Sequence, residues 1–107
     1  MDTLVRISPQ AHADIKTIYD FVKKDGEDIA KNQAKYIYGE IEHLAQFPNI
    51  GIPLQKYVSR KTDLRILVVR KVYIVIYNSA NTVDVIRVFR KEQDFIAALG
   101  LGAEEDD

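Results

Sequence analysis

Cationic and phenolic side chains in the second half of the chain are the residues that could perform chemistry on a partner. They lie on or near three β-rich segments, and the set is Arg60, Lys61, Arg65, Arg70, Lys71, Tyr73, Tyr77, Arg87, Arg90 and Lys91. Arginine binds phosphate through paired hydrogen bonds, and tyrosine can stack on a base or donate a proton. Metal-free RNA cleavage needs cations for the phosphate, a proton donor and a proton acceptor. The set therefore indicates a surface for an anionic partner or a metal-independent nuclease.

The same residues also have structural explanations. Both tyrosines of the set are strong β-formers and could lie at the edge of a core. Arg65 and Arg87 could form ion pairs with a nearby aspartate, such as Asp63 or Asp84. For any single member of the set, the structural role is the better expectation.

Other chemistries lack the residues that they require. The chain contains no cysteine, which excludes disulfides, thiol nucleophiles and thiolate metal sites. No serine lies in a nucleophile-elbow pattern, and the glycines form no phosphate-binding loop. Asp25, Glu27 and Asp28 fall at a helix–helix turn, where they favour capping over metal binding, and His12 and His43 are expected on the surface. We therefore predict neither a metal nor a cofactor.

Charge is distributed unevenly along the chain. Residues 1–53 carry a net charge of −2, and residues 54–103 carry nine Lys or Arg against four Asp or Glu, a net charge of +5. Residues 104–107 add four negative charges. A basic half-domain suits a polyanion or an acidic protein partner, although a solvated surface of mixed sign is an equal alternative.

Two amphipathic helices are predicted before residue 48. Ser8 can cap the first helix, and Pro9 suits its first position. Asp25-Gly26 ends this helix, because glycine tolerates the left-handed backbone that closes a helix. The second helix begins near Asp28 and ends before Pro48, and Tyr36 and Tyr38 flank its apolar stripe. The stripe consists of Ala30, Ala34, Ile37, Ile41, Leu44 and Phe47.

The remaining regular elements are strands and one short helix. A short strand is predicted over residues 3–7, and three further strands over Leu64–Val69, Val72–Tyr77 and Thr82–Phe89. Arg70-Lys71 lacks the residues that the tightest hairpin turns prefer, so a longer turn is possible. A last helix is predicted near residues 91–99.

This order of elements, β-α-α-β-β-β-α, predicts an α+β two-layer domain. A helical hairpin packs on one face of a mostly antiparallel four-stranded sheet. We expect the other face to be concave or free and to be built by the basic half of the chain. The domain is assigned to residues 1–100 and an acidic tail to 101–107. The longest apolar run, Val72–Tyr77, is far shorter than a membrane helix, so a cytoplasmic location without membrane contact is expected.

Short motifs in a fixed order between Val5 and Phe95 carry a family resemblance. They are Ser8-Pro9, Ala13-Asp14-Ile15, Leu44-Ala45-Gln46-Phe47-Pro48, Gly51, residues 64–68, Tyr73–Tyr77 and Val85–Phe89. The chain resembles the RelE/ParE superfamily of type II toxin–antitoxin toxins, with the ParE-like branch favoured. The family's arginine–aspartate ending is Gln93-Asp94 here.

The resemblance implies a toxin of a plasmid-stabilisation module that a cognate antitoxin neutralises. RelE-like nucleases have an arginine where this chain has Ile74, and a tyrosine or histidine where the nearest aromatic residue is Phe95. The ParE-like branch inhibits DNA gyrase by binding, but its usual histidine and following arginine are Arg90 and Gln93 here.

Three functions therefore stay open. The favoured one is growth inhibition by binding, with DNA gyrase as the target. The alternatives are a ribosome-dependent mRNA endonuclease, with Arg65, Arg87, Arg90 and Lys91 as catalytic candidates, and a non-toxic antitoxin-binding module. The proposed surface for target or antitoxin consists of Arg60, Lys61, Arg65, Arg70, Tyr73, Tyr77, Arg87 and Arg90.

Overall fold

The structure is a computed structural model that describes residues 2–102, and it has an α+β fold. The strands are β1 (Val5–Ile7), β2 (Ile52–Pro53), β3 (Arg65–Val69), β4 (Tyr73–Asn78) and β5 (Val83–Arg90). The α-helices are α1 (Pro9–Val22), α2 (Glu27–His43) and α3 (Phe95–Ala98), with 3₁₀ turns η1 (Lys23–Asp25) and η2 (Leu54–Lys56). None of the helices in this part of the chain is long and apolar enough to cross a membrane.

The sheet has the order β1-β5-β4-β3-β2. β1 runs parallel to β5, and the other neighbours are antiparallel. The prediction of a mostly antiparallel sheet is confirmed, but there are five strands and not four. The additional strand β2 pairs with β3 through Ile52 and Pro53. A two-residue strand that contains proline leaves almost no alternating pattern in the sequence, so it was not predicted.

Capping explains where the first helix begins. The Ser8 hydroxyl accepts a hydrogen bond from the Ala11 N–H at 3.0 Å and donates one to the Ile86 carbonyl at 3.0 Å. Pro9 occupies the first turn, as predicted. The second helix ends at His43 and not before Pro48, because residues 44–46 form a turn. Phe47, the last member of the predicted stripe, is half exposed.

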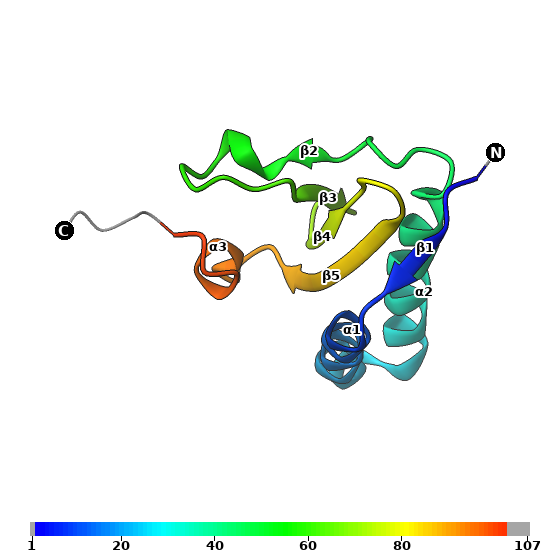
Figure 1. The fold of residues 1–107 in the computed structure, drawn as a ribbon. Coiled ribbons are helices and arrows are strands. Elements are labelled where there is room, and N and C mark those ends of the chain that lie inside the picture. Colours follow the sequence, from blue (N-terminus) through cyan, green and yellow to red (C-terminus); the bar gives the residue numbers. More distant parts are fainter. Residues whose placement is uncertain (1, 103–107) are drawn as a thin grey trace.

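The main core lies between α1, α2 and one face of the sheet (Figure 1). The helices contribute Ala11, Ile15, Ile18, Ile37, Ile41 and Leu44, and the strands contribute Val69, Tyr73, Val75, Tyr77, Val83, Val85 and Val88. In α1 the residues Ala11, Ile15 and Ile18, which recur at helical spacing, are buried, and Val22 at the end of the same face is partly buried. This packing fixes one face of every long strand toward the helices.

The opposite sheet face carries a second apolar cluster. Leu54, Ile66, Ile74, Ile76 and Phe89 are buried there, with Val58, Leu64, Ile86, Phe95, Leu99 and Leu101 packed against them. As expected, the basic half of the chain builds this face, but its side chains are mostly apolar and the face is partly covered and not free. β4 is the central strand and is apolar on both faces, as its continuous apolar sequence requires. Residues 103–107 of the expected acidic tail lie outside the described residues.

The turn between β3 and β4 has an unusual backbone. Val69 pairs with Tyr73, so three residues separate the strands, in line with a turn longer than the tightest type. Arg70 and Lys71 have φ angles of 55° and 62°, and the Val72 N–H donates to the Val69 carbonyl at 3.1 Å. Positive φ is uncommon for residues other than glycine, asparagine and aspartate, so the sequence gives no sign of this conformation.

Candidate functional site

Tyr73 and Tyr77 are buried in the main core and use their hydroxyl groups within the fold. The Tyr73 hydroxyl donates to Gln33 Oε1 at 2.9 Å, and the Tyr77 hydroxyl accepts from the Gly51 N–H at 2.9 Å. Burial raises the pKa of both phenols, although nearby arginines lower it in part. The rings therefore have a structural role, which was the better expectation for any single member of the set.

Arg65 and Tyr77 together hold the loop before β2. Arg65 Nη1 donates to the carbonyl oxygens of Gly51 at 2.8 Å and Asn49 at 3.3 Å. A Cβ atom on Gly51 would lie 2.7 Å from the Tyr77 hydroxyl and 2.8 Å from the Ile66 carbonyl oxygen. Glycine is thus required at position 51 by close packing, and Arg65 is engaged through its Nη1 group with the backbone of this loop.

Arg87 pairs with Asp14, and not with Asp63 or Asp84. Its Nε lies 2.8 Å from Asp14 Oδ2 and its Nη2 lies 3.2 Å from Asp14 Oδ1. The hydrogen bond to this carboxylate raises the pKa of Arg87. Asp84 instead pairs with Arg6 at 2.8 Å across the β1–β5 ladder.

Asp14 also replaces a missing strand at the edge of β5. β1 pairs with β5 only from Val83 to Val85. Beyond that point the Val88 N–H donates to Asp14 Oδ2 at 2.9 Å. The buried Asp14 side chain thus joins α1 to the open part of the β5 edge, and its motif Ala13-Asp14-Ile15 has a structural reason.

The remaining cations lie in two places. Arg70, Lys71, Arg90 and Lys91 are at one end of the sheet, where the Lys91 N–H donates to the Val72 carbonyl at 2.7 Å. Arg60 and Lys61 are exposed on the segment between η2 and β3. The predicted surface of eight residues is therefore distributed over the fold, and the structure does not bring its members together at one site.

No grouping of the described residues has the composition of a metal site. His12 Nδ1 lies 2.7 Å from the Tyr38 hydroxyl on the exposed side of the helical hairpin, and His43 packs edge-on against Phe47. Both histidines are exposed, as expected. Glu27 accepts a hydrogen bond from the Tyr19 hydroxyl at 3.3 Å. It also lies in the first turn of α2, the position that the capping interpretation gives it.

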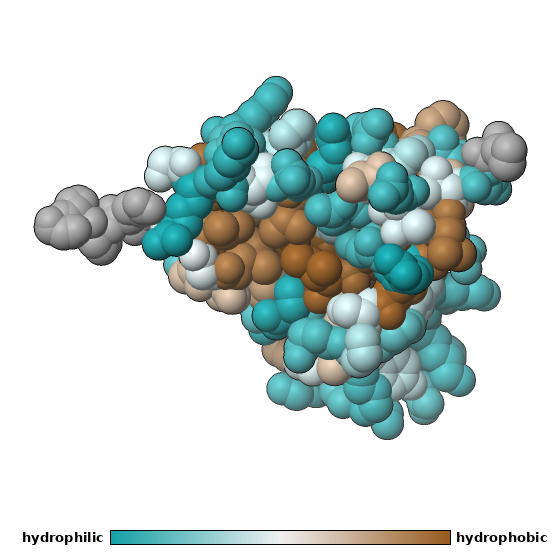
Figure 2. Space-filling view, in the orientation of Figure 1, coloured by the Kyte–Doolittle hydropathy of each residue, from teal (hydrophilic) through white to brown (hydrophobic). Residues whose placement is uncertain are grey.

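An apolar groove is the surface that sequence reasoning missed. It lies on the sheet face opposite α1 and α2 and is lined by Ile52, Tyr57, Ile66, Val68, Ile74, Phe95 and Ile96, with a volume of about 230 Å³. Figure 2 shows hydrophobic residues gathered over the sheet between η2 and β5, with hydrophilic residues beside them. Val68 is 48% exposed and Tyr57 is 59% exposed, which is unusual for large side chains beside a core. The signal in the sequence was the apolar character of both alternating sets of residues in β4.

Two further features of the groove favour a protein ligand. The segment that carries η2 supplies the exposed cations Lys56, Arg60 and Lys61. β2 pairs with β3 at Arg65 and Ile66, and among residues 2–102 no strand pairs with β3 on this side from Leu67 to Val69. An open strand edge beside an apolar groove can bind an extended or helical segment of another chain. Among the described residues that line the groove, Tyr57 alone has a polar side-chain group.

Comparisons with known proteins agree with this fold. A sequence model of the family described as "ParE toxin of type II toxin-antitoxin system, parDE" matches residues 5–95. This span is the one over which the resemblance was expected. Among solved structures, the chain is similar to one titled "Chromosomal ParDE TA system from P. aeruginosa", with a TM-score of 0.69 and 19% sequence identity. That match covers 84% of this chain and 97% of the other, and at such identity it shows the fold alone. No match is found among curated proteins.

Proposed function

The chain belongs to the ParE toxin family of type II toxin–antitoxin systems, and we propose that it inhibits growth by binding DNA gyrase until a cognate antitoxin neutralises it. Both partners would be met in the bacterial cytoplasm. The single observation that supports action by binding is the apolar groove with its neighbouring cations. Such a surface fits a protein chain better than a substrate that must be cleaved.

The antitoxin is the partner that we assign to the groove. An acidic segment with apolar side chains would bury Ile52, Tyr57 and Val68, which are all exposed in the isolated toxin. Carboxylates on that segment would lie near the cations of residues 56–61. Most of the affinity would come from apolar burial, so it should survive raised salt better than a purely ionic contact.

Binding is favoured over RNA cleavage by the position of the candidate catalytic groups. Ile74 and Phe95, where RelE-like nucleases have reactive side chains, both line the apolar groove. Arg65 and Arg87 are engaged with the Gly51 loop and with Asp14. A concerted general acid and base would need proton-transferring groups within hydrogen-bond reach of one phosphate. Among the four candidates, Arg87 and Arg90 line one pocket, but Arg87 is paired with Asp14 there and Arg65 is held at the Gly51 loop.

A supercoiling assay tests the proposed target. Purified gyrase, relaxed plasmid and ATP are incubated with the toxin alone and with the toxin–antitoxin complex. We expect the toxin to block supercoiling or to trap cleaved DNA, and the complex to have no effect. Unchanged supercoiling at a large molar excess of folded toxin would contradict gyrase as the target. A parallel incubation with translating ribosomes and mRNA tests the nuclease alternative.

A further inference from the structure

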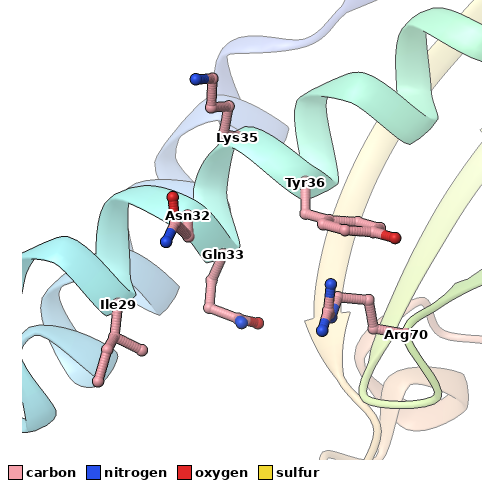
Figure 3. A pocket seen from close by; sticks show the side chains of 6 residues that line it. All are labelled: Ile29, Asn32, Gln33, Lys35, Tyr36 and Arg70. Atoms are coloured by element: carbon pink, nitrogen blue, oxygen red, sulfur yellow. The ribbon is translucent and has the colours of Figure 1, made fainter.

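The β3–β4 turn and α2 enclose a second cavity, which the proposed function does not use. Its volume is about 500 Å³, and it is lined by Ile29, Asn32, Gln33, Lys35, Tyr36 and Arg70. We call it the turn–helix pocket (Figure 3). None of these lining residues is acidic. Because α2 covers the other face of the sheet, this pocket lies on the opposite side of the sheet from the apolar groove.

The Arg70 guanidinium is oriented so that its N–H groups are available to an anion in this pocket. Its guanidinium lies over the Tyr36 ring, 4.2 Å from the ring centroid, and Figure 3 shows the two groups facing each other. Within residues 2–102 the Arg70 side chain has no hydrogen bond or ion pair. A guanidinium that stacks on an aromatic ring keeps its N–H edge available for a carboxylate or a phosphate.

The backbone beneath Arg70 is strained. Arg70 and Lys71 both have positive φ angles, and a Cβ atom makes this left-handed conformation unfavourable. Asparagine and glycine would adopt this turn at lower cost. Strain of this kind tends to occur at functional sites, and here it places two cations at the tip of the hairpin.

The surroundings of the pocket combine positive charge with exposed apolar side chains. Arg90 stacks over the Phe21 ring at 4.3 Å, and Lys91 lies beside the turn through its bond to the Val72 carbonyl. Glu92 pairs with Arg90 at 3.0 Å. The exposed apolar residues are Phe21, Ile29, Tyr36 and Val72, each between 42% and 48% exposed. Aliphatic residues beside arginines match a protein segment better than a nucleic-acid backbone, which needs cations and stacking rings but gains little from Ile29.

We propose that the turn–helix pocket binds an acidic segment of a partner protein. One carboxylate of that segment pairs with the two N–H groups of Arg70, and a neighbouring apolar side chain packs on Ile29 and Tyr36. Because the pocket and the apolar groove lie on opposite sheet faces, the toxin can hold this segment while the groove is occupied. The proposal does not depend on whether gyrase is the toxin's target.

Peptide selection on the full-length chain tests this proposal. A displayed random library is selected on the immobilised toxin, and the amide shifts of ¹⁵N-labelled toxin locate each recovered peptide. We expect a class of peptides that shifts the amides of Ile29, Tyr36 and Arg70 and that contains Asp or Glu next to Leu, Ile or Phe. Recovery of peptides at this pocket without acidic residues, or of none at all, would overturn the proposal.

Two charge reversals with the same formal charge change separate the pocket from general electrostatics. Arg70→Glu should weaken binding of these peptides about tenfold or more, because it removes a desolvated charge pair. Lys71→Glu lies in the same turn and does not line the pocket, so it should change affinity less than about threefold. Equal losses in the two variants would contradict a specific role for Arg70.

Two controls complete the test. One is a conservative variant that should fold normally, and the other is a nucleic-acid ligand. Arg70→Lys keeps the charge and the turn but loses the planar fork, so it should still weaken binding several-fold while leaving the thermal midpoint unchanged. Full affinity in this variant would contradict paired N–H recognition. A fluorescein-labelled oligothymidylate should not bind in an Arg70-dependent way at physiological salt, and if it does, the site is a nucleic-acid site instead.

Discussion

Asp14 is the side chain on which the junction between α1 and β5 depends. Its carboxylate accepts hydrogen bonds from Arg87 and from the Val88 N–H, and Gln10 Nε2 donates a further one at 3.0 Å. These donors have few other partners, since β1 does not extend along this part of β5. A single acid thus satisfies a strand edge and neutralises a partly buried guanidinium.

Replacement of Asp14 should therefore be strongly destabilising. We expect Asp14→Ala to lower the free energy of unfolding by about 3 kcal/mol, because Arg87 and the Val88 N–H lose their acceptor. Urea unfolding followed by far-UV circular dichroism measures this loss. Arg6→Gln, which removes an exposed ion pair with Asp84, is the control and should cost much less. Equal losses in the two variants would contradict this account of Asp14.

The buried tyrosines should make the folded state unstable at high pH. Burial raises the pKa of Tyr73 and Tyr77 above the ordinary value, so the folded state favours the neutral phenols. Their contribution to stability is complete below the pKa of unfolded tyrosine, about 10. It is lost as the pH rises through the raised values of the folded state. Phenolate absorbance should therefore show a late phase that coincides with loss of circular dichroism, and Tyr77→Phe should reduce that phase. A titration that is complete before any unfolding would contradict the burial of these rings.

Among the elements, the β3–β4 turn has a strained backbone whose cost to stability can be measured by substitution. Lys71→Gly should raise the free energy of unfolding by about 1 kcal/mol, because glycine adopts positive φ without a steric cost. Lys71→Ala removes the same charge but keeps the Cβ atom, so it should leave stability nearly unchanged. Chemical denaturation of the two variants provides the comparison. A destabilised glycine variant would indicate that the turn does not adopt the left-handed conformation.

The elements also show which features the sequence can and cannot predict. The two helices and three long strands follow from apolar spacing and from Ser8-Pro9, which are local signals. β2 was missed because its pairing with β3 depends on the loop that Arg65 and Tyr77 hold, a contact between distant residues. The positions of the cations relative to one another could not be predicted for the same reason, because they depend on contacts between distant residues. Sequence order places Arg65 and Arg87 on strands, but only the packing of α1 and of residues 49–51 decides what each one contacts.

At the scale of the whole molecule, the two sheet faces have different surfaces. One face is covered by α1 and α2, whose side carries the turn–helix pocket. The other face is partly covered by α3 and η2 (Figure 1). The apolar groove lies on this second face. Under the proposed function, an antitoxin in the groove leaves the turn–helix pocket on the other side accessible.

A charged residue in the groove should separate the toxin from its antitoxin. Val68→Glu places a carboxylate on an exposed apolar position of β3, and we expect antitoxin affinity to fall about tenfold or more. Leu4→Glu makes the same change at a position that is 61% exposed and outside the groove, so it should bind normally. Titration calorimetry with the cognate antitoxin gives both affinities. Normal binding by folded Val68→Glu toxin would place the antitoxin elsewhere.

We propose that the toxin stops growth by binding gyrase and not by cutting mRNA. Pulse labelling of bacteria after tightly controlled induction of the toxin alone tests it most directly, with incorporation into DNA and into protein followed together over the first minutes. If gyrase is the target, we expect an early fall in DNA synthesis while translation continues. An early fall in protein synthesis with DNA synthesis intact would contradict it and make the ribosome the target.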